Sequence, residues 1–364
     1  MKSLSHSLIG FLFHLAVLFL IVFPGSSHAQ MWGAYSPELG GGNAATISAA
    51  GNTTAIDSGI VAGVSNPAGY FTSRNEILFE GDLWGSLSIQ SHVKSPQPRP
   101  DFGSIFYLAK IKSCVFALSY RPLRHYQASA VYADGDLVSR AKFSEVEAAL
   151  ALRNRRGYSF GMALTWMNGT LSSLDINNVY RLEEVHRTVQ YLALGLRKQV
   201  NNVKIGLVVE PPSLGVLNVG EPAISNIRDY TEYSFSGLWG LRMGIGVEDT
   251  SYAGELDVSF HNANSVDVDN FNSNTKGLLM AAGMSAKYQW QQDLLLQMGF
   301  RYGYAETESG RHLLYGIGAR YEVTPEVALL AGIGIVQGVD RNYAALDDVL
   351  PYDLRIGILY HETP

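Results

Sequence analysis

From about residue 75 to its end, the chain alternates between large apolar residues and small or polar ones with a period of two. Between Phe235 and Val247, every second residue except one glycine is large and apolar, and most residues between them are glycine, serine or arginine. The pattern recurs at 294–304 and 352–360. Successive side chains of a strand point to opposite faces, so these segments are predicted strands with one face for lipid and one for a lumen.

Along the whole chain the alternation predicts about fourteen strands, an even number as in bacterial membrane barrels. The predicted ranges are 75–91, 102–110, 113–121, 140–153, 157–168, 187–200, 202–211, 233–248, 251–261, 277–290, 292–304, 311–322, 325–337 and 352–360. One hairpin is easily miscounted by this method, most of all around Tyr126–Tyr132.

The connections between these strands alternate in length. Short links such as Ile111-Lys112 and Asp249-Thr250 separate long polar ones such as Pro122–Ser139 and Pro212–Glu232. Tight turns at one rim and long loops at the other are typical of an all-β, transmembrane, antiparallel β-barrel. A soluble β-sandwich would also alternate, but it would have to bury the aromatic-rich apolar face in a core.

The first 29 residues predict a signal peptide. Lys2 precedes an apolar run, Leu8–Phe23, and Ser27-His28-Ala29 has the small residues of a cleavage site, so cleavage is expected near Ala29. A retained helical anchor is the alternative. No later stretch approaches the roughly 20 consecutive apolar residues of a spanning helix. We therefore expect an exported protein that is inserted by the barrel-assembly machinery into the outer membrane of a Gram-negative cell, with outer-membrane lipid around it.

Charge and cysteine content exclude some partners and chemistry. The net charge of −6 includes no block of like charges, which argues against nucleic acid as a partner. The single cysteine, Cys114, has no internal partner for a disulfide, and we interpret it as a small packed residue.

The segment before the strands differs in composition. Residues 30–73 are rich in glycine, alanine, serine, threonine and asparagine, contain Gly40-Gly41-Gly42, and end in Ser65-Asn66-Pro67-Ala68-Gly69. Such a segment is either a disordered tail or a plug inside the lumen. We expect three regions: a signal peptide at 1–29, an N-terminal hatch at 30–73 and an outer-membrane β-barrel at 74–364.

These residues resemble a known family. The run Ala44–Ile56, the motif Asn66-Pro67-Ala68-Gly69 and the entry to the first strand at Asn75-Glu76-Ile77 are similar to the FadL/TodX family of outer-membrane transporters. The resemblance implies a fourteen-stranded barrel with a hatch, which binds long-chain fatty acids or aromatic hydrocarbons and releases them laterally through the wall. The chain lacks an unmistakable hydrophobic capture loop, which leaves the substrate open.

Motifs for covalent chemistry are weak. Gly157-Tyr158-Ser159-Phe160-Gly161 matches the nucleophile elbow of hydrolases, but Ser159 lies inside a predicted strand and not at a strand-to-helix turn. The scattered histidines lack metal-ligand spacing, and no helix follows Gly332, Gly334 and Gly338 as a dinucleotide fingerprint requires. We therefore expect no enzyme activity, no metal and no cofactor.

Four arginines are predicted to face the lumen, where they could contact a ligand carboxylate or merely pair with protein carboxylates: Arg242, Arg301, Arg320 and Arg355. The leading prediction is passive, hatch-gated diffusion of a hydrophobic small molecule, with Asn66 to Gly69 setting the hatch geometry. The alternative is a structural barrel linked to type IX secretion, which would act through protein partners.

Overall fold

The computed structural model describes residues 43–88, 99–132, 135–154, 156–175, 180–212, 214–220, 230–236, 239–263, 277–305, 310–338 and 349–362. The predicted signal peptide and residues 30–42 of the predicted hatch lie outside the described residues.

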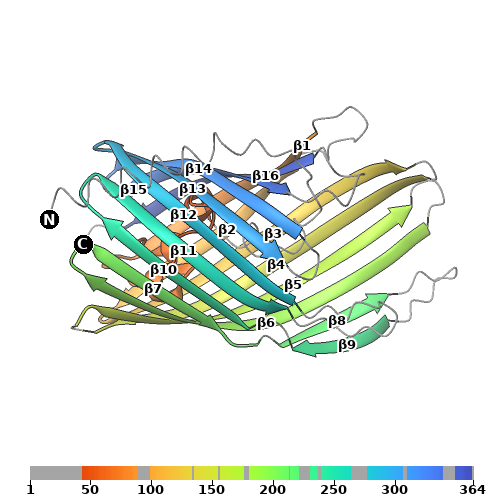
Figure 1. Ribbon diagram of the computed structural model, residues 1–364, viewed down its shortest axis with the longest axis horizontal. Coiled ribbons are helices and arrows are strands. Elements are labelled where there is room, and N and C mark those ends of the chain that lie inside the picture. The colour runs from red at the N-terminus through yellow and green to blue at the C-terminus, as the bar shows by residue number, and fades with distance from the viewer. Residues whose placement is uncertain are drawn as a thin grey trace.

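Fourteen antiparallel strands close into a barrel (Figure 1). The ring follows the sequence from β1 to β7 and from β10 to β16, and it closes where Ile77 of β1 faces Tyr360 of β16. Its strands are β1 (Glu76–Ser88), β2 (Arg99–Ile111), β3 (Cys114–Tyr132), β4 (Gly135–Arg153), β5 (Tyr158–Asp175), β6 (Tyr180–Val200), β7 (Val203–Glu210), β10 (Gly240–Glu248), β11 (Tyr252–Ala263), β12 (Gly277–Gln291), β13 (Leu294–Ala305), β14 (Gly310–Thr324), β15 (Val327–Gly338) and β16 (Val349–His361).

The two rims differ as the connection lengths predict. Two residues, Lys112 and Ser113, join β2 to β3, and Lys112 takes the left-handed conformation (φ 58°) that tight hairpin turns require. The ring begins and ends at this same rim, where Glu76 faces His361. We call it the short-turn rim and the opposite one the long-loop rim.

The predicted number of ring strands is confirmed, but two predicted segments were wrong. The connection predicted at 212–232 contains a further hairpin, β8 (Leu214–Gly220) and β9 (Tyr230–Ser236), and β8 pairs with the far end of β6. The single strand predicted at 233–248 is two strands, β9 and β10. Pro211 and Pro212 explain the break after β7, because proline has no N–H to donate to a sheet.

The strands β3 to β6 are longer than predicted, at 18 to 21 residues. Much of the connection predicted at 122–139 is strand, as the doubt about Tyr126–Tyr132 anticipated. The long strands and the β8–β9 hairpin extend past the rest of the long-loop rim on one side of the barrel (Figure 1). Alternation fades there because a strand beyond the membrane needs no lipid-facing side.

The predicted faces of the wall are confirmed. On β10, Met243 and Ile245 point outward and are 43% and 50% exposed, while the alternate residues Gly244 and Gly246 are buried against the interior. Outward apolar and aromatic side chains continue around the ring, for example Phe116, Phe160 and Ile358. A band this large would be unstable in water, and it identifies a transmembrane barrel surrounded by lipid.

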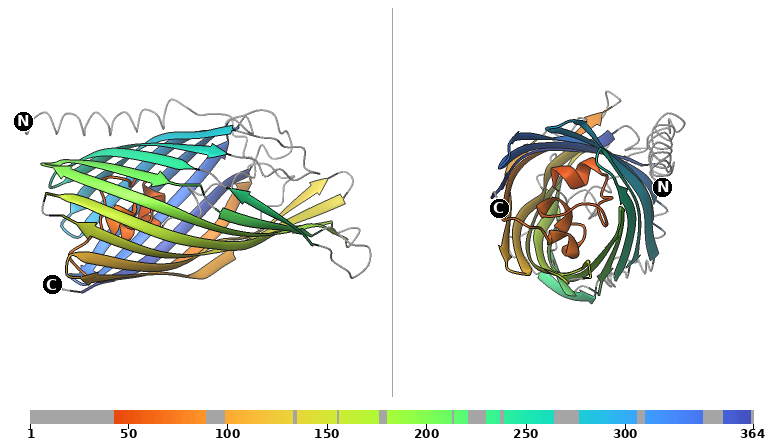
Figure 2. Two further views of the ribbon diagram at one scale, coloured as in Figure 1. Left: turned by 90° about the horizontal axis from the view of Figure 1, so that it is seen from below. Right: turned by 90° about the vertical axis from the view of Figure 1, so that its left-hand side faces the viewer.

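Residues 43–75 lie inside the barrel (Figure 2, right). They form three short helices, α3 (Ala44–Ser48), α4 (Ile60–Gly63) and the 3₁₀ helix η2 (Pro67–Tyr70), joined by turns. We call residues 43–75 the lumen segment. Among the described residues, no helix has the length and apolar character to cross a bilayer.

Candidate functional site

The lumen segment rests on a series of inward-facing glycines. A methyl group at Gly299 would overlap the backbone of Ala49, and one at Gly161 would overlap the peptide between Pro67 and Ala68. Because glycine has no Cβ, the two backbones approach directly. We call the glycines that contact the segment in this way seats. From β15 round to β5 they are Gly332, Gly318, Gly316, Gly299, Gly283, Gly244, Gly206, Gly195 and Gly161. The segment therefore follows the wall from β15 round to β5.

Hydrogen bonds and ion pairs hold the first part of the segment to the strands opposite β1. Glu255 of β11 accepts hydrogen bonds from the backbone N–H groups of Ala55 at 2.6 Å and Ile56 at 3.1 Å. The Asn52 side chain donates to the carbonyl of Phe300 at 3.0 Å and accepts from Arg301 Nη1 at 3.1 Å. These bonds satisfy buried polar groups that would otherwise be costly.

Arg197 of β6 lies at the centre of this network. Its Nε and Nη2 donate to the carbonyls of Thr54 and Thr53, each at 2.9 Å, and Nη1 donates to the carbonyl of Asp57. Gly69 lies directly against its guanidinium. One buried side chain of the wall thus bonds to the middle of the segment, residues 53–57, and contacts Gly69 near its end. Sequence reasoning missed Arg197, although it shares the inward parity of Gly195 on a correctly predicted strand.

The predicted motif Asn66-Pro67-Ala68-Gly69 forms η2 and its N-cap. The Asn66 Oδ1 accepts from Ala68 N at 3.0 Å, and Nδ2 donates to the Thr54 carbonyl at 2.8 Å. Pro67 occupies the first helical turn, where its missing N–H costs nothing. The motif is therefore a turn that also bonds to another part of the lumen segment.

Tyr70 follows the motif and reaches β4, the strand next to β5. Its hydroxyl donates to Glu147 of β4, and Arg121 of β3 pairs with both Glu147, at 3.0 Å, and Glu145. Burial raises the pKa of Tyr70 well above its usual value, so the hydroxyl stays protonated and remains a donor. This cluster was not predicted from the sequence, because nothing local to Glu147 indicates its partner.

The four predicted arginines meet protein groups. Arg301 lies 3.5 Å from Asp257 and also bonds to Ser259 and Asn52, and Arg355 donates to Asp353 at 3.0 Å, all fully buried. Arg320 pairs with Glu322 at 2.6 Å and is about 31% exposed. Arg242 interacts electrostatically with Asp257. Ligand contact by these arginines remains a prediction.

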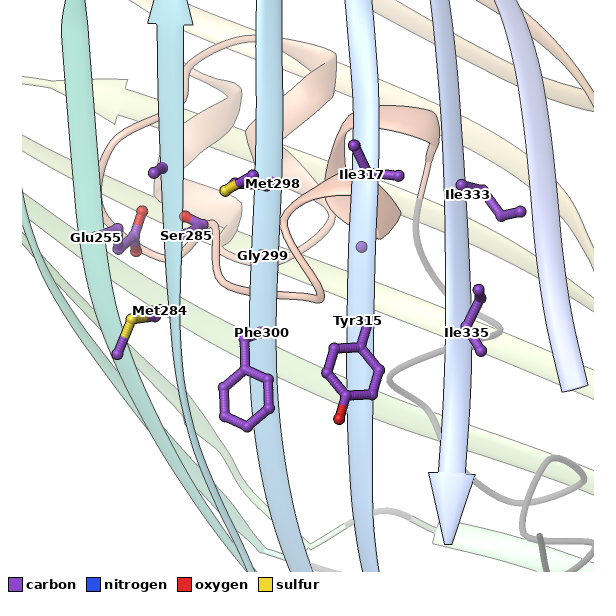
Figure 3. A pocket seen from close by; sticks show the side chains of 12 residues that line it. Glu255, Met284, Ser285, Met298, Gly299, Phe300, Tyr315, Ile317, Ile333 and Ile335 are labelled. Carbon is purple, nitrogen blue, oxygen red and sulfur yellow. The ribbon is translucent and has the colours of Figure 1, made fainter. Parts of the chain in front are cut away.

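An apolar groove of about 210 Å³ crosses β12 to β15 on the outer face of the wall (Figure 3). Its large side chains, such as Met298, Tyr315 and Ile333, come from outward positions, and Gly299 and Gly316 contribute its floor. Most of the groove therefore faces lipid, and the inward Glu255 and Ser285 line the rest of it. Ser159, the serine of the hydrolase-like motif, lies within strand β5 and not at a strand-to-helix turn.

No protein-family model matches the chain, and no curated protein matches it. Solved structures do match. The toluene transporter TodX of P. putida aligns with 90% of this chain and 100% of its own, at 12% identity and a TM-score of 0.62. The Ralstonia pickettii toluene transporter TbuX aligns with 89% of this chain and 98% of its own, at 14% identity and a TM-score of 0.62. A Pseudomonas aeruginosa FadL homologue aligns with 88% of this chain and 98% of its own, at 9% identity and a TM-score of 0.62. The resemblance predicted from the sequence is thus confirmed at the level of fold: this chain has the barrel of the FadL- and TodX-type hydrophobic compound channels.

Proposed function

We propose that the chain is an outer-membrane transport protein for hydrophobic small molecules, either long-chain fatty acids or aromatic hydrocarbons, and that the lumen segment is its hatch. The observation that carries this proposal is the lumen segment, seated around the inner wall of a fourteen-stranded barrel. The fold shared with toluene transporters and a FadL homologue supports it. Export by a signal peptide cleaved near Ala29 belongs to the same proposal.

A lateral exit is supported by the pairing of β2 and β3. In the described part of these strands, their ladder runs from Ile111–Cys114 to Ile105–Tyr120 and ends there. Above it, β2 continues paired with β1, and β3 continues paired with β4 after a register shift between Pro122 and Arg124. The two strands thus part within the wall, next to the Arg121 cluster that holds Tyr70. We propose this divergence as the route into the membrane.

Diffusion through this barrel would be passive. A hydrophobic molecule would enter from the long-loop rim, displace part of the hatch and leave for the membrane, driven by its own concentration gradient. Such displacement requires that the ligand bind the open state more tightly than the closed one.

The alternative, a barrel that acts through protein partners in secretion, is supported by one observation. The β3–β6 strands and the β8–β9 hairpin form a sheet beyond the long-loop rim, and β9 pairs with β8 on one edge. Such a sheet offers a broad surface to a protein, and a strand edge is able to pair with a further strand.

Native mass spectrometry of protein extracted in mild detergent from outer membranes separates the two functions. A retained fatty acid or aromatic hydrocarbon supports transport and identifies its class. An empty barrel in a defined protein complex overturns transport in favour of the secretion-linked role. Uptake of radiolabelled palmitate and toluene by cells expressing the chain, compared with cells lacking it, gives a second measurement.

A further inference from the structure

The short-turn rim is divided by charge around the ring. The turns that join β2 to β3, β4 to β5 and β6 to β7, with the three residues on either side of each, include no aspartate or glutamate among their described residues. The turns that join β10 to β11, β12 to β13 and β14 to β15, taken in the same way, include no lysine or arginine. The described basic residues of the first side are Lys110, Lys112, Arg153, Arg156, Lys198 and Lys204.

Lys198 points outward, toward the lipid. Residues that face each other in an antiparallel pair lie on the same side of a sheet, and Lys198 faces Tyr158 of β5 and Ile205 of β7. Ile205 is 48% exposed on the outer face, whereas the preceding residue of β6, Arg197, is buried against the lumen segment. Of the described side chains that point outward from the ring strands, that of Lys198 is the only charged one.

Two contacts fix the Lys198 side chain at the rim. Its Nζ lies 3.7 Å from the centre of the Tyr158 ring and donates to the carbonyl of Arg156 at 2.7 Å. The aliphatic stem thus stays on the apolar outer face while the ammonium reaches the turn between β4 and β5, as in a lysine that snorkels to the surface of a membrane. None of the ion pairs between described residues includes Lys198, and its ammonium has two further N–H donors.

The surroundings of this ammonium are basic and lie at the edge of the lipid. Arg156 is exposed in the turn whose carbonyl Lys198 bonds, and Arg153, at the end of β4, is exposed as well. Next to them, toward the middle of the membrane, the outer face is apolar, with Phe160 48% exposed. The site therefore combines cations at the level of the lipid headgroups with an apolar surface beside the acyl chains, which fits an anionic amphiphile.

A soluble protein fits this arrangement less well than a lipid does. It would reach the exposed arginine of the turn, but the bilayer covers the outer face of β5 to β7, where the stem of Lys198 lies. A lipid of the surrounding leaflet reaches both. The phosphate of its headgroup would accept charge-assisted hydrogen bonds from Lys198 and Arg156, and an acyl chain would lie along Phe160 and Ile205.

We propose that the outer edge of the short-turn rim between β4 and β7 binds the headgroup of an anionic phospholipid, with Lys198 and Arg156 as its cations. The site lies outside the lumen, so this inference goes beyond the proposed transport and does not depend on it. Because the opposite side of the rim is acidic, anionic lipid is expected to gather on one side of the barrel.

Matched variants test the site. Lys198→Gln removes the outward cation, and Lys110→Gln makes the same change at a lysine of this rim whose Nζ bonds to the Ser73 carbonyl of the lumen segment at 3.2 Å. Lys198→Arg keeps the charge. Each protein is purified in mild detergent and mixed with equal amounts of phosphatidylglycerol and phosphatidylcholine that have the same acyl chains. Native mass spectrometry then counts the bound lipids, and heat modifiability on gels verifies that each barrel is folded.

We expect the wild type to retain phosphatidylglycerol in preference to phosphatidylcholine, and Lys198→Gln to reduce that preference roughly fivefold, which is the effect of one cation near a charged membrane surface. Lys198→Arg should keep the preference, and Lys110→Gln should change it by less than twofold. Equal results in the two glutamine variants, or a wild type without preference, would overturn the inference. A wild type that binds both lipids equally but retains an acidic protein would overturn it in favour of a protein partner at the same cations.

Discussion

Replacing Arg197 by methionine is expected to loosen residues 53–57 of the lumen segment without opening the barrel wall. The guanidinium donates to the carbonyls of Thr53, Thr54 and Asp57, and methionine keeps most of the apolar volume while removing all three donors. A hydrogen bond from a charged donor contributes about 1.5–3 kcal/mol. Two effects reduce the total: the Thr54 carbonyl keeps its bond from Asn66, and water can enter beside the others.

We therefore expect the docked state of residues 53–57 to lose about 3 kcal/mol of stability, which is roughly a hundredfold change in the docking equilibrium constant. Amide hydrogen exchange followed by mass spectrometry measures this directly. Exchange of residues 53–57 should accelerate by about that factor, whereas the ring strands should exchange as in the wild type.

Lys198→Met is the matched control, because the neighbouring residue lies on the same strand and its Nζ bonds to the Arg156 carbonyl at the short-turn rim rather than to the segment. Unchanged exchange of 53–57 in folded Arg197→Met protein would refute the assigned role of Arg197. Uniform acceleration throughout the barrel would show that Arg197 supports the wall instead.

Three further predictions concern the segment and the predicted arginines. Gly299→Val places a side chain where Ala49 lies and should destabilise docking by about 1–3 kcal/mol, visible as faster exchange of residues 44–52; unaltered exchange would contradict the seat. Asn66→Ala removes the N-cap of η2 and should cost about 1 kcal/mol, with faster exchange of residues 66–70 but not of 44–48, and equal acceleration of both would argue against a local cap. Arg355→Leu removes the buried cation that pairs with Asp353 and should destabilise the barrel by about 3–5 kcal/mol in urea unfolding. Arg320→Leu, at a partly exposed ion pair, should destabilise it by less than about 1 kcal/mol. Loss of ligand binding by Arg355→Leu with stability intact would instead favour a ligand contact for Arg355.

The strands of the wall could be predicted because the alternation depends only on which face of its own strand each residue occupies. Lipid on one side and a lumen on the other impose a period of two, which places Met243 outward and Gly244 inward without any knowledge of the partner strands. The same reasoning failed where that constraint ends. The far ends of β3 to β6 and most of the β8–β9 hairpin alternate less regularly in the sequence, so these residues were assigned to loops.

The candidate site was predictable only in part. The motif Asn66–Gly69 could be found because turn chemistry is local, and the seats could be expected in general because glycines recur at inward positions. The partners could not be found. Arg197 meets Thr53 across more than a hundred residues, and the irregular segment has no periodicity that would align it with the wall.

The glycine seats also determine how stiff the barrel is. A strand residue without a side chain makes few contacts of its own, and glycine within a strand weakens it. In this barrel the missing contacts are supplied by the backbone and small side chains of the lumen segment, glycine by glycine, from Gly332 to Gly161. The segment thus acts as an inner hoop that braces the cylinder. A chain from which residues 43–70 are deleted should therefore be a softer barrel with a distorted cross-section, and it would be a poor substitute for the open state of the proposed transporter.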